Sequence, residues 1–162
     1  KPVIASVKGY ALANGAGLVF ACDLAVAAED AKIGTTAINV GLICTGPAVP
    51  LARSLGRKKT LEMILTGDMI SAGEAERLGL VNKVVPADER EEATMELARK
   101  LAANSPMALQ IGKTAMYAMQ DVPYHQSIDY LTELFAALCS TEDAMDGVQA
   151  FLEKRKPAWK ER

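Results

Sequence analysis

Residues 9–23, GYALANGAGLVFACD, set an Asn-Gly dipeptide between short apolar runs that are built mainly from small residues. Asn-Gly is a common turn dipeptide, so we expect a turn at Asn14-Gly15 and then a short helix from Ala16 to Cys22. On either side, Val3–Val7 is rich in β-branched residues and Leu24–Ala28 is continuously apolar, which predicts two buried strands. The alternation of strand, helix and strand predicts an α/β fold.

Further strand signals follow in the first half of the chain. Lys32-Ile33-Gly34 predicts a third strand, and Leu80–Val85 predicts an edge strand. Between them, Ser71 and Glu74 have the spacing of a capping box, in which each side chain accepts a hydrogen bond from the other residue's backbone N–H.

From Pro47 onward the pattern is mostly helical. Asp88–Ala103 is amphipathic, and Ser105-Pro106 is typical of a helix start. We expect Ser140 to cap the last helix and Lys154–Lys156 to lie in its last turn, where cations stabilise the helix dipole. The chain is therefore α/β first and α-rich afterwards.

Composition excludes several classes of protein. Half of the 162 residues are apolar, and 18 Lys and Arg against 20 Asp and Glu give a net charge of −2, which does not favour a nucleic-acid partner. The longest apolar stretch, residues 15–28, is broken by Asp23 and is too short to span a bilayer, so we expect no membrane association. Cys22, Cys44 and Cys139 are widely spaced, which favours a reducing cytoplasm. A single histidine, His125, gives no metal-ligand cluster.

Residues 9–23 resemble the signature of the crotonase (enoyl-CoA hydratase/isomerase) superfamily, in which a strand, a Gly-rich turn and a helix ending in Cys-Asp follow one another. The resemblance continues in family order to the end of the chain. Within the family, the chain resembles a glutamate-poor subgroup, the enoyl-CoA hydratase domain-containing proteins. Since the chain opens inside an expected strand without Met, we expect residues to precede it. The segments that carry the resemblance are residues 9–23, 32–34, 38–42, 65–72, 75–81 and 150–157.

The resemblance implies a partial ββα spiral core of the ClpP/crotonase type over residues 1–86 and an α-helical trimerisation region over residues 87–162. It also implies an acyl-CoA thioester as substrate or ligand and no separate cofactor. In the family, backbone N–H groups stabilise the negative charge on the thioester oxygen. The resemblance puts one such donor at Asn14, beside Gly15, and a second donor in residues before this chain.

The chain departs from the family at the residues that move protons. Hydratases of the family use two glutamates, whose positions here are Gly17 and Ala37. Neither residue can transfer a proton, and each acid–base group typically contributes roughly 10²–10⁴-fold to the rate. We therefore expect very low hydratase turnover. Asp23 matches a family-wide residue with a structural role. The other candidates for the missing acid or base are weaker, and one supplied by residues before this chain stays open; the candidates are Thr35, Thr36, Cys44, Thr45 and His125.

Two surfaces are expected to meet partners. By resemblance, Phe151 and Lys154 reach the CoA moiety in a neighbouring subunit; alternatively, Phe151 is a core residue and Lys154 a solvated cation. Terminal helices of the family pack between subunits, so we expect a homotrimer or hexamer.

Three functions stay open. The first is an enoyl-CoA hydratase/isomerase, a lyase of fatty-acid metabolism, that keeps its oxyanion site. The second is another enolate reaction, such as double-bond isomerisation or thioester hydrolysis. The third is a non-catalytic acyl-CoA-binding or scaffold protein.

Overall fold

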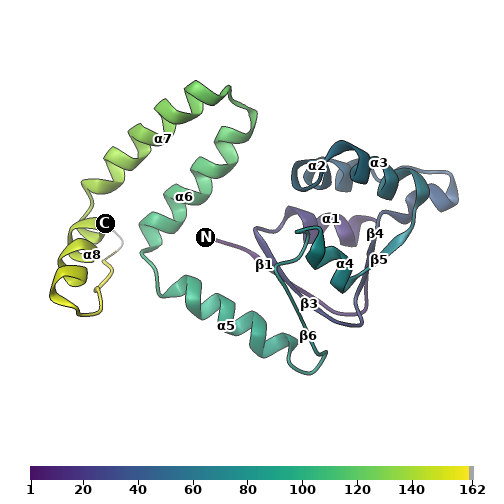
Figure 1. The fold of residues 1–162 in the computed structure, drawn as a ribbon, viewed down its shortest axis with the longest axis horizontal. Coiled ribbons are helices and arrows are strands. Elements are labelled where there is room, and N and C mark those ends of the chain that lie inside the picture. Colours follow the sequence, from purple (N-terminus) through teal and green to yellow (C-terminus); the bar gives the residue numbers. More distant parts are fainter. Residues whose placement is uncertain (161–162) are drawn as a thin grey trace. The chain divides into compact units, whose positions relative to one another are not determined.

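The computed structural model describes residues 1–160 and has the expected α/β pattern followed by helices (Figure 1). The strands and helices that precede residue 103 are β1 (Ile4–Val7), β2 (Tyr10–Leu12), α1 (Asn14–Ala21), β3 (Leu24–Ala28), β4 (Lys32–Gly34), η1 (a 3₁₀-helix, Thr36–Val40), α2 (Thr45–Ser54), α3 (Arg57–Thr66), β5 (Met69–Ser71), α4 (Ala72–Arg77), β6 (Lys83–Val85) and α5 (Arg90–Ala102). The elements that follow are α6 (Pro106–Ala118), η2 (Met119–Asp121), α7 (Tyr124–Cys139) and α8 (Glu142–Glu153).

By their internal contacts the residues form two compact units. One contains Val3–Ala98, and the other contains Lys1–Pro2 together with the chain from Arg99 onward. This division rests on contacts alone. The segments expected from the family, residues 1–86 and 87–162, stay a prediction.

Two three-stranded sheets form the framework of the first unit. One has the order β1-β3-β6 with all strands parallel, and the other has the order β2-β4-β5, in which β2 and β4 are parallel and β5 is antiparallel. Parallel strands are usually covered on both faces and are therefore continuously apolar, which explains why Leu24–Ala28 was recognisable from its composition. β6 lies at a sheet edge as expected, but it is shorter than the predicted Leu80–Val85.

The core of this unit is built largely from small side chains. α1 packs on α2, and Ala16 of α1 and Leu51 of α2 are both fully buried. Ile33 of β4 and Met63 of α3 belong to the same cluster. Alanine and glycine at the contacts between elements let their backbones approach closely, as the composition of residues 9–31 had indicated.

Three predicted helix ends differ in the structure. Ser71 accepts a hydrogen bond from the Glu74 N–H at 3.2 Å, but the Glu74 carboxylate accepts two bonds from Arg77 instead of completing the capping box. Thr141, not Ser140, caps α8, because Thr141 has the extended backbone of an N-cap while Ser140 is still helical. Lys154 is a left-handed C-cap after Glu153, so Lys154–Lys156 lie beyond the last turn of α8.

A buried carboxylate organises the second unit. The Ser105 hydroxyl donates to Asp143 at 2.6 Å, and the Lys160 backbone N–H donates to the same carboxylate at 2.7 Å. Asp143 is only 1% exposed, so these bonds are shielded from water. The Trp159 indole N–H donates to the Ala103 carbonyl at 2.8 Å, which holds residues after α8 against the start of the unit.

The apolar stripe predicted along α7 is present, and residues 1–160 cover it only in part. Ile128 and Phe135 are exposed, and Leu131, Leu134 and Leu138 are half-buried. An open hollow of about 340 Å³ lies between α7 and α8 and is lined by Cys139, Ala144, Met145, Val148 and Gln149.

Candidate functional site

The candidate site forms at the carboxyl edge of the parallel pair β2 and β4. Leu12 and Gly34 are register partners at the ends of these strands, and the Ala13 N–H donates to the Gly34 carbonyl at 2.9 Å. The chain leaves β2 directly into α1 and leaves β4 directly into η1. The sequence therefore brings the Gly-rich segment and the Ala37 segment to one edge, which is where ligands bind in many α/β proteins.

α1 begins two residues earlier than predicted. Asn14 and Gly15 are its first two residues, and the turn falls on Ala13, whose φ of 47° and ψ of −119° are unusual for a residue with a side chain. No side chain caps this helix. Because the first N–H groups of a helix have no intrahelical acceptor, those of Asn14 and Gly15 are available to a ligand, and both residues are exposed.

Gly17 faces a rigid neighbour. A Cβ atom placed on Gly17 would lie 2.9 Å from Cγ and 3.3 Å from Cα of Pro47 in α2. Pro47 is buried. Position 17 therefore has no room for a side chain unless Pro47 or the backbone shifts.

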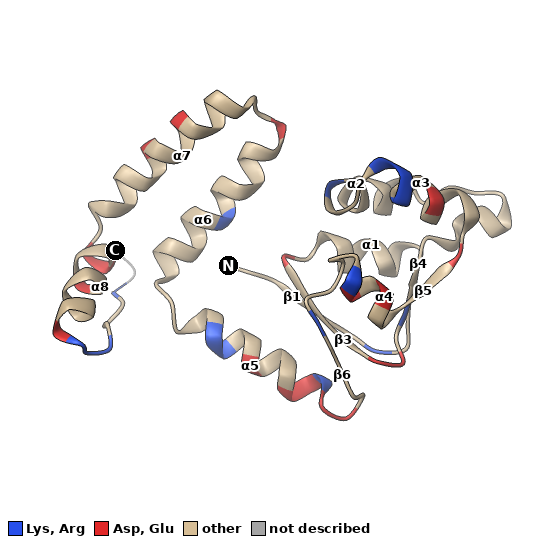
Figure 2. Cartoon of the chain, in the orientation of Figure 1, with Lys and Arg blue, Asp and Glu red and all other residues tan. Residues whose placement is uncertain are grey.

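Ala37 lies in η1, and its neighbours hold this segment in place. The buried hydroxyl of Thr35 donates to the Met63 carbonyl at 2.8 Å, and the Asn39 side-chain amide lies 3.4 Å from the Gly67 carbonyl. Thr35 is thus engaged in a structural bond and is not a free hydroxyl beside the site. Neither α1 nor η1 contains a titratable side chain, and Figure 2 shows α1 without charged residues.

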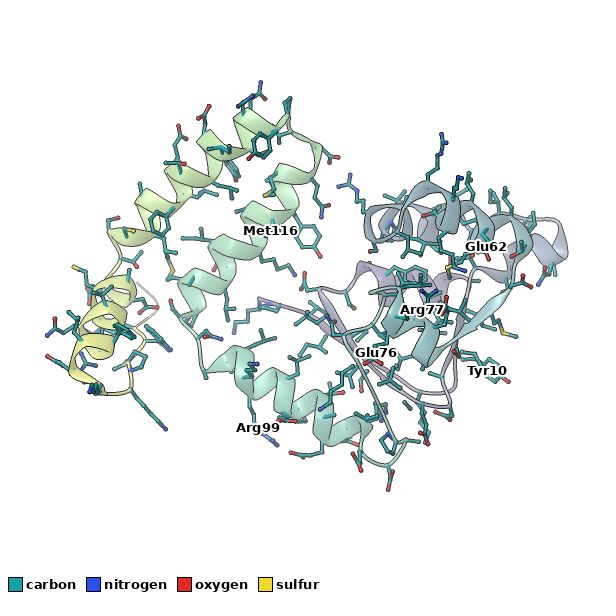
Figure 3. The ribbon with its side chains drawn as sticks, in the orientation of Figure 1. Tyr10, Glu62, Glu76, Arg77, Arg99 and Met116 are labelled. Carbon is teal, nitrogen blue, oxygen red and sulfur yellow. The ribbon has the colours of Figure 1, made fainter. Side chains whose placement is uncertain are left out.

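An open hollow of about 360 Å³ borders the start of α1. Its walls come from β1, β2 and α1 and include Gly15, Leu18 and Val19. Tyr10 also borders this hollow; its side chain extends away from β2 and is 73% exposed (Figure 3). The surface beside the candidate donors is therefore mainly apolar.

The remaining predicted residues lie outside α1 and η1. Phe151 and Lys154 belong to the second unit, and Phe151 is 83% exposed among the described residues; both interpretations of this pair stay predictions. His125 is exposed at the start of α7. The Asp23 carboxylate accepts the Val3 N–H at 2.6 Å, a structural bond between β1 and the turn after α1.

Among the described residues, the shifted pKa values belong to surface ion pairs that involve no residue of α1 or η1. A side-chain hydrogen bond from Arg155 lowers the pKa of Asp146, and a similar bond from Arg77 lowers the pKa of Glu74. Within residues 1–160, no group of His, Cys, Asp and Glu side chains could hold a metal ion. None of the helices described is both long and apolar enough to cross a membrane.

A strand–helix unit with uncapped N–H groups at a parallel-sheet edge, followed by a helical region, is the arrangement expected of the crotonase fold. The chain belongs to the enoyl-CoA hydratase/isomerase family, whose sequence pattern matches residues 1–162. It is similar to the human mitochondrial protein named enoyl-CoA hydratase domain-containing protein 3, with 42% identity over 158 residues. It is also 40% identical over 163 residues to 2,3-dehydroadipyl-CoA hydratase of Escherichia coli strain K12.

A solved structure supports the same assignment. The enoyl-CoA hydratase of Bacillus anthracis superposes with a TM-score of 0.96 at 37% identity, covering 100% of this chain and 63% of that chain. The predicted crotonase-like fold is confirmed. The matches to the human and E. coli proteins cover 98% and 100% of this chain but only 52% and 64% of those proteins, so this chain spans less than two thirds of their length.

Two residues that shape the site were not singled out from the sequence. Ala13 has the strained backbone at the start of α1, and Pro47 occupies the space next to Gly17. The sequence marked Pro47 only as the start of the mostly helical part, and it gave no signal for the backbone of Ala13.

Proposed function

We propose that this chain binds an acyl-CoA thioester and polarises its carbonyl at the start of α1, as a family member with very low hydratase turnover. The observation that carries the proposal is the uncapped first turn of α1 at the carboxyl edge of β2 and β4. The N–H groups of Asn14 and Gly15 are directional donors, and the helix dipole adds positive potential at the same end. Such an arrangement stabilises an enolate oxygen more than a neutral carbonyl.

The low turnover follows from the proton-transfer step. Hydration needs one group that deprotonates water and one that protonates the α-carbon. Gly17 and Ala37 provide neither, and α1 and η1 contain no other titratable side chain. The neutral hydroxyl of Thr35 is a poor base, and it already donates to a backbone carbonyl.

The test combines turnover with binding. We expect slow or undetectable loss of the conjugated thioester absorbance of crotonyl-CoA, together with measurable binding of the same ligand by calorimetry. Rapid hydration would contradict the argument from Gly17 and Ala37. Absence of binding would contradict the proposed ligand.

Variants at one position test the donor itself. Asn14→Pro removes the backbone N–H at the first helical position, where proline is tolerated, and Asn14→Ala keeps it. Loss of one hydrogen bond should weaken thioester binding about tenfold in the proline variant only. Equal affinity of the two variants, with equal thermal stability, would show that this N–H does not contact the ligand.

A non-catalytic acyl-CoA-binding protein is the second candidate. It is favoured by the contact between Gly17 and Pro47, because that contact closes the position of one proton-transfer group. Another enolate reaction, isomerisation or thioester hydrolysis, would need an acid or base from outside α1 and η1. Binding of butyryl-CoA without turnover of crotonyl-CoA or hydrolysis of either thioester would favour the non-catalytic candidate.

Assembly and CoA contacts are part of the same proposal. We propose that the exposed face of α7 and α8, including Phe135, Val148 and Phe151, packs against further copies in a homotrimer or hexamer. Phe151 and Lys154 would then reach CoA bound to a neighbouring subunit. Sedimentation equilibrium tests the assembly: Phe135→Asp and Val148→Asp should each shift the mass toward the monomer, and an unchanged mass would argue against this face.

We further propose a reducing compartment, with the cytoplasm as the expected location, and no resident cofactor besides the CoA ligand. The thiols of Cys22, Cys44 and Cys139 are unpaired in the structure, and Cys44 is buried, which supports this proposal. Fluorescence microscopy of the tagged protein and mass spectrometry of the native protein would test location and cofactor content.

A further inference from the structure

Where α1 contacts α2, the rigid ring of Pro47 occupies the space into which a side chain at position 17 would project. A Cβ on Gly17 would meet Pro47 at three atoms, with 2.9 Å to Cγ and 3.3 Å to both Cα and Cβ. Distances below 3.0 Å require that one of the two groups moves. Gly15, in the same helix, would meet nothing within 4 Å, so the restriction belongs to position 17 and not to α1 in general.

Pro47 cannot move aside easily. Its ring has no flexible torsions comparable to those of a long side chain, and its own backbone Cα is among the close atoms. It occupies the third position of α2, where its missing N–H leaves no helical hydrogen bond unmade. The next turn of α2 is anchored by Leu51, which is fully buried.

The contact between Gly17 and Pro47 contains no group that exchanges protons. Gly17 contributes only backbone, and the Pro47 ring offers C–H groups without a donor N–H. Neither can donate a proton to the bound thioester or accept one from water.

We propose that Pro47 keeps position 17 without a side chain, and so without a proton-transfer group, because its ring occupies the space that a Cβ atom there would need. This inference rests on the proposed function, but the steric conflict between positions 17 and 47 can be measured without a ligand. It predicts that a carboxylate can return to position 17 only when residue 47 is also made small.

The experiment compares the thermal unfolding of the unaltered chain with four variants: Gly17→Glu, Pro47→Gly, the double variant, and Gly15→Glu as a matched control on the same helix. We expect Gly17→Glu to lower Tm by about 5 °C or more and Gly15→Glu to change it by less than about 2 °C. The double variant should have a Tm only slightly below that of Pro47→Gly, whereas Gly17→Glu alone should fall well below the unaltered chain.

Two outcomes overturn the inference: a double variant whose Tm loss equals the sum of the single losses, and a Gly17→Glu variant as stable as the control. A butyryl-CoA titration of the unaltered chain separates the two proposals. Lack of binding there argues against the proposed function only, since the Tm comparison does not involve the ligand.

Discussion

The smallest change that tests the site is a single methyl group on α1. Replacing glycine by alanine inside a helix normally stabilises it by roughly 0.5–1 kcal/mol, because alanine loses less backbone entropy on folding. Gly15 and Gly17 are two residues apart in α1, and neither has a positive φ. From helix propensity alone, both substitutions would be expected to stabilise the protein.

The structure predicts opposite signs instead. Gly15→Ala adds a methyl group in open space, whereas Gly17→Ala puts Cβ 2.9 Å from the Pro47 ring. Overpacking of this kind costs about 1–3 kcal/mol. After the propensity gain is subtracted, Gly17→Ala should lower the free energy of unfolding by up to about 2 kcal/mol, while Gly15→Ala raises it slightly.

Urea denaturation of the two variants, monitored by circular dichroism, measures this difference directly. A shift of the midpoint with an unchanged m-value would show that native-state stability changed rather than the unfolded state. Equal stabilisation of both variants would refute the claim that Pro47 restricts position 17. It would also remove the structural basis for excluding a carboxylate from position 17.

Three further outcomes follow from contacts described above. Ala13→Gly should raise the free energy of unfolding by about 1 kcal/mol in the same urea assay, because glycine adopts the Ala13 backbone without strain; a loss would mean that the turn is unstrained. Asp143→Ala should lower it by about 3 kcal/mol, because the buried Ser105 hydroxyl loses its acceptor, and a loss below 1 kcal/mol would contradict the buried network. Arg155 lowers the pKa of Asp146 in the folded protein. This ion pair therefore stabilises the fold above the unfolded pKa of about 4, and its contribution is lost as the pH falls through the lower folded pKa. An acid titration of Tm should therefore show a smaller decrease below pH 4 for Asp146→Asn than for the unaltered chain.

Much of the fold could be predicted because its signals are local. The run Leu24–Ala28 is a strand with the predicted bounds, since a buried parallel strand must be apolar on both faces. The start of α1 was displaced by two residues because Asn-Gly is equally compatible with a turn and with a first helical turn. Thr141 rather than Ser140 caps α8 because two adjacent hydroxyls offer the same signal, and backbone conformation decides between them.

The candidate site was predictable by residue type but not by packing. The pattern predicted that Gly17 and Ala37 stand where hydratases of the family carry glutamates, and this stays a prediction. Pro47, however, lies 30 residues beyond Gly17, and only the approach of α2 to α1 brings them together. Periodicity likewise predicted the apolar stripe on α7 but not that the chain leaves Phe135 uncovered.

The contact between Gly17 and Pro47 also has a consequence for how such sequences change over generations. Each position limits the substitutions tolerated at the other. The effect of a change at one position therefore depends on the residue that the other position already carries. In a chain that carries Pro47, Gly17→Glu is expected to lower stability, whereas the same change should be tolerated better once residue 47 is small. Of the two orders in which both changes can be made, the one that begins at position 47 therefore avoids the less stable single variant.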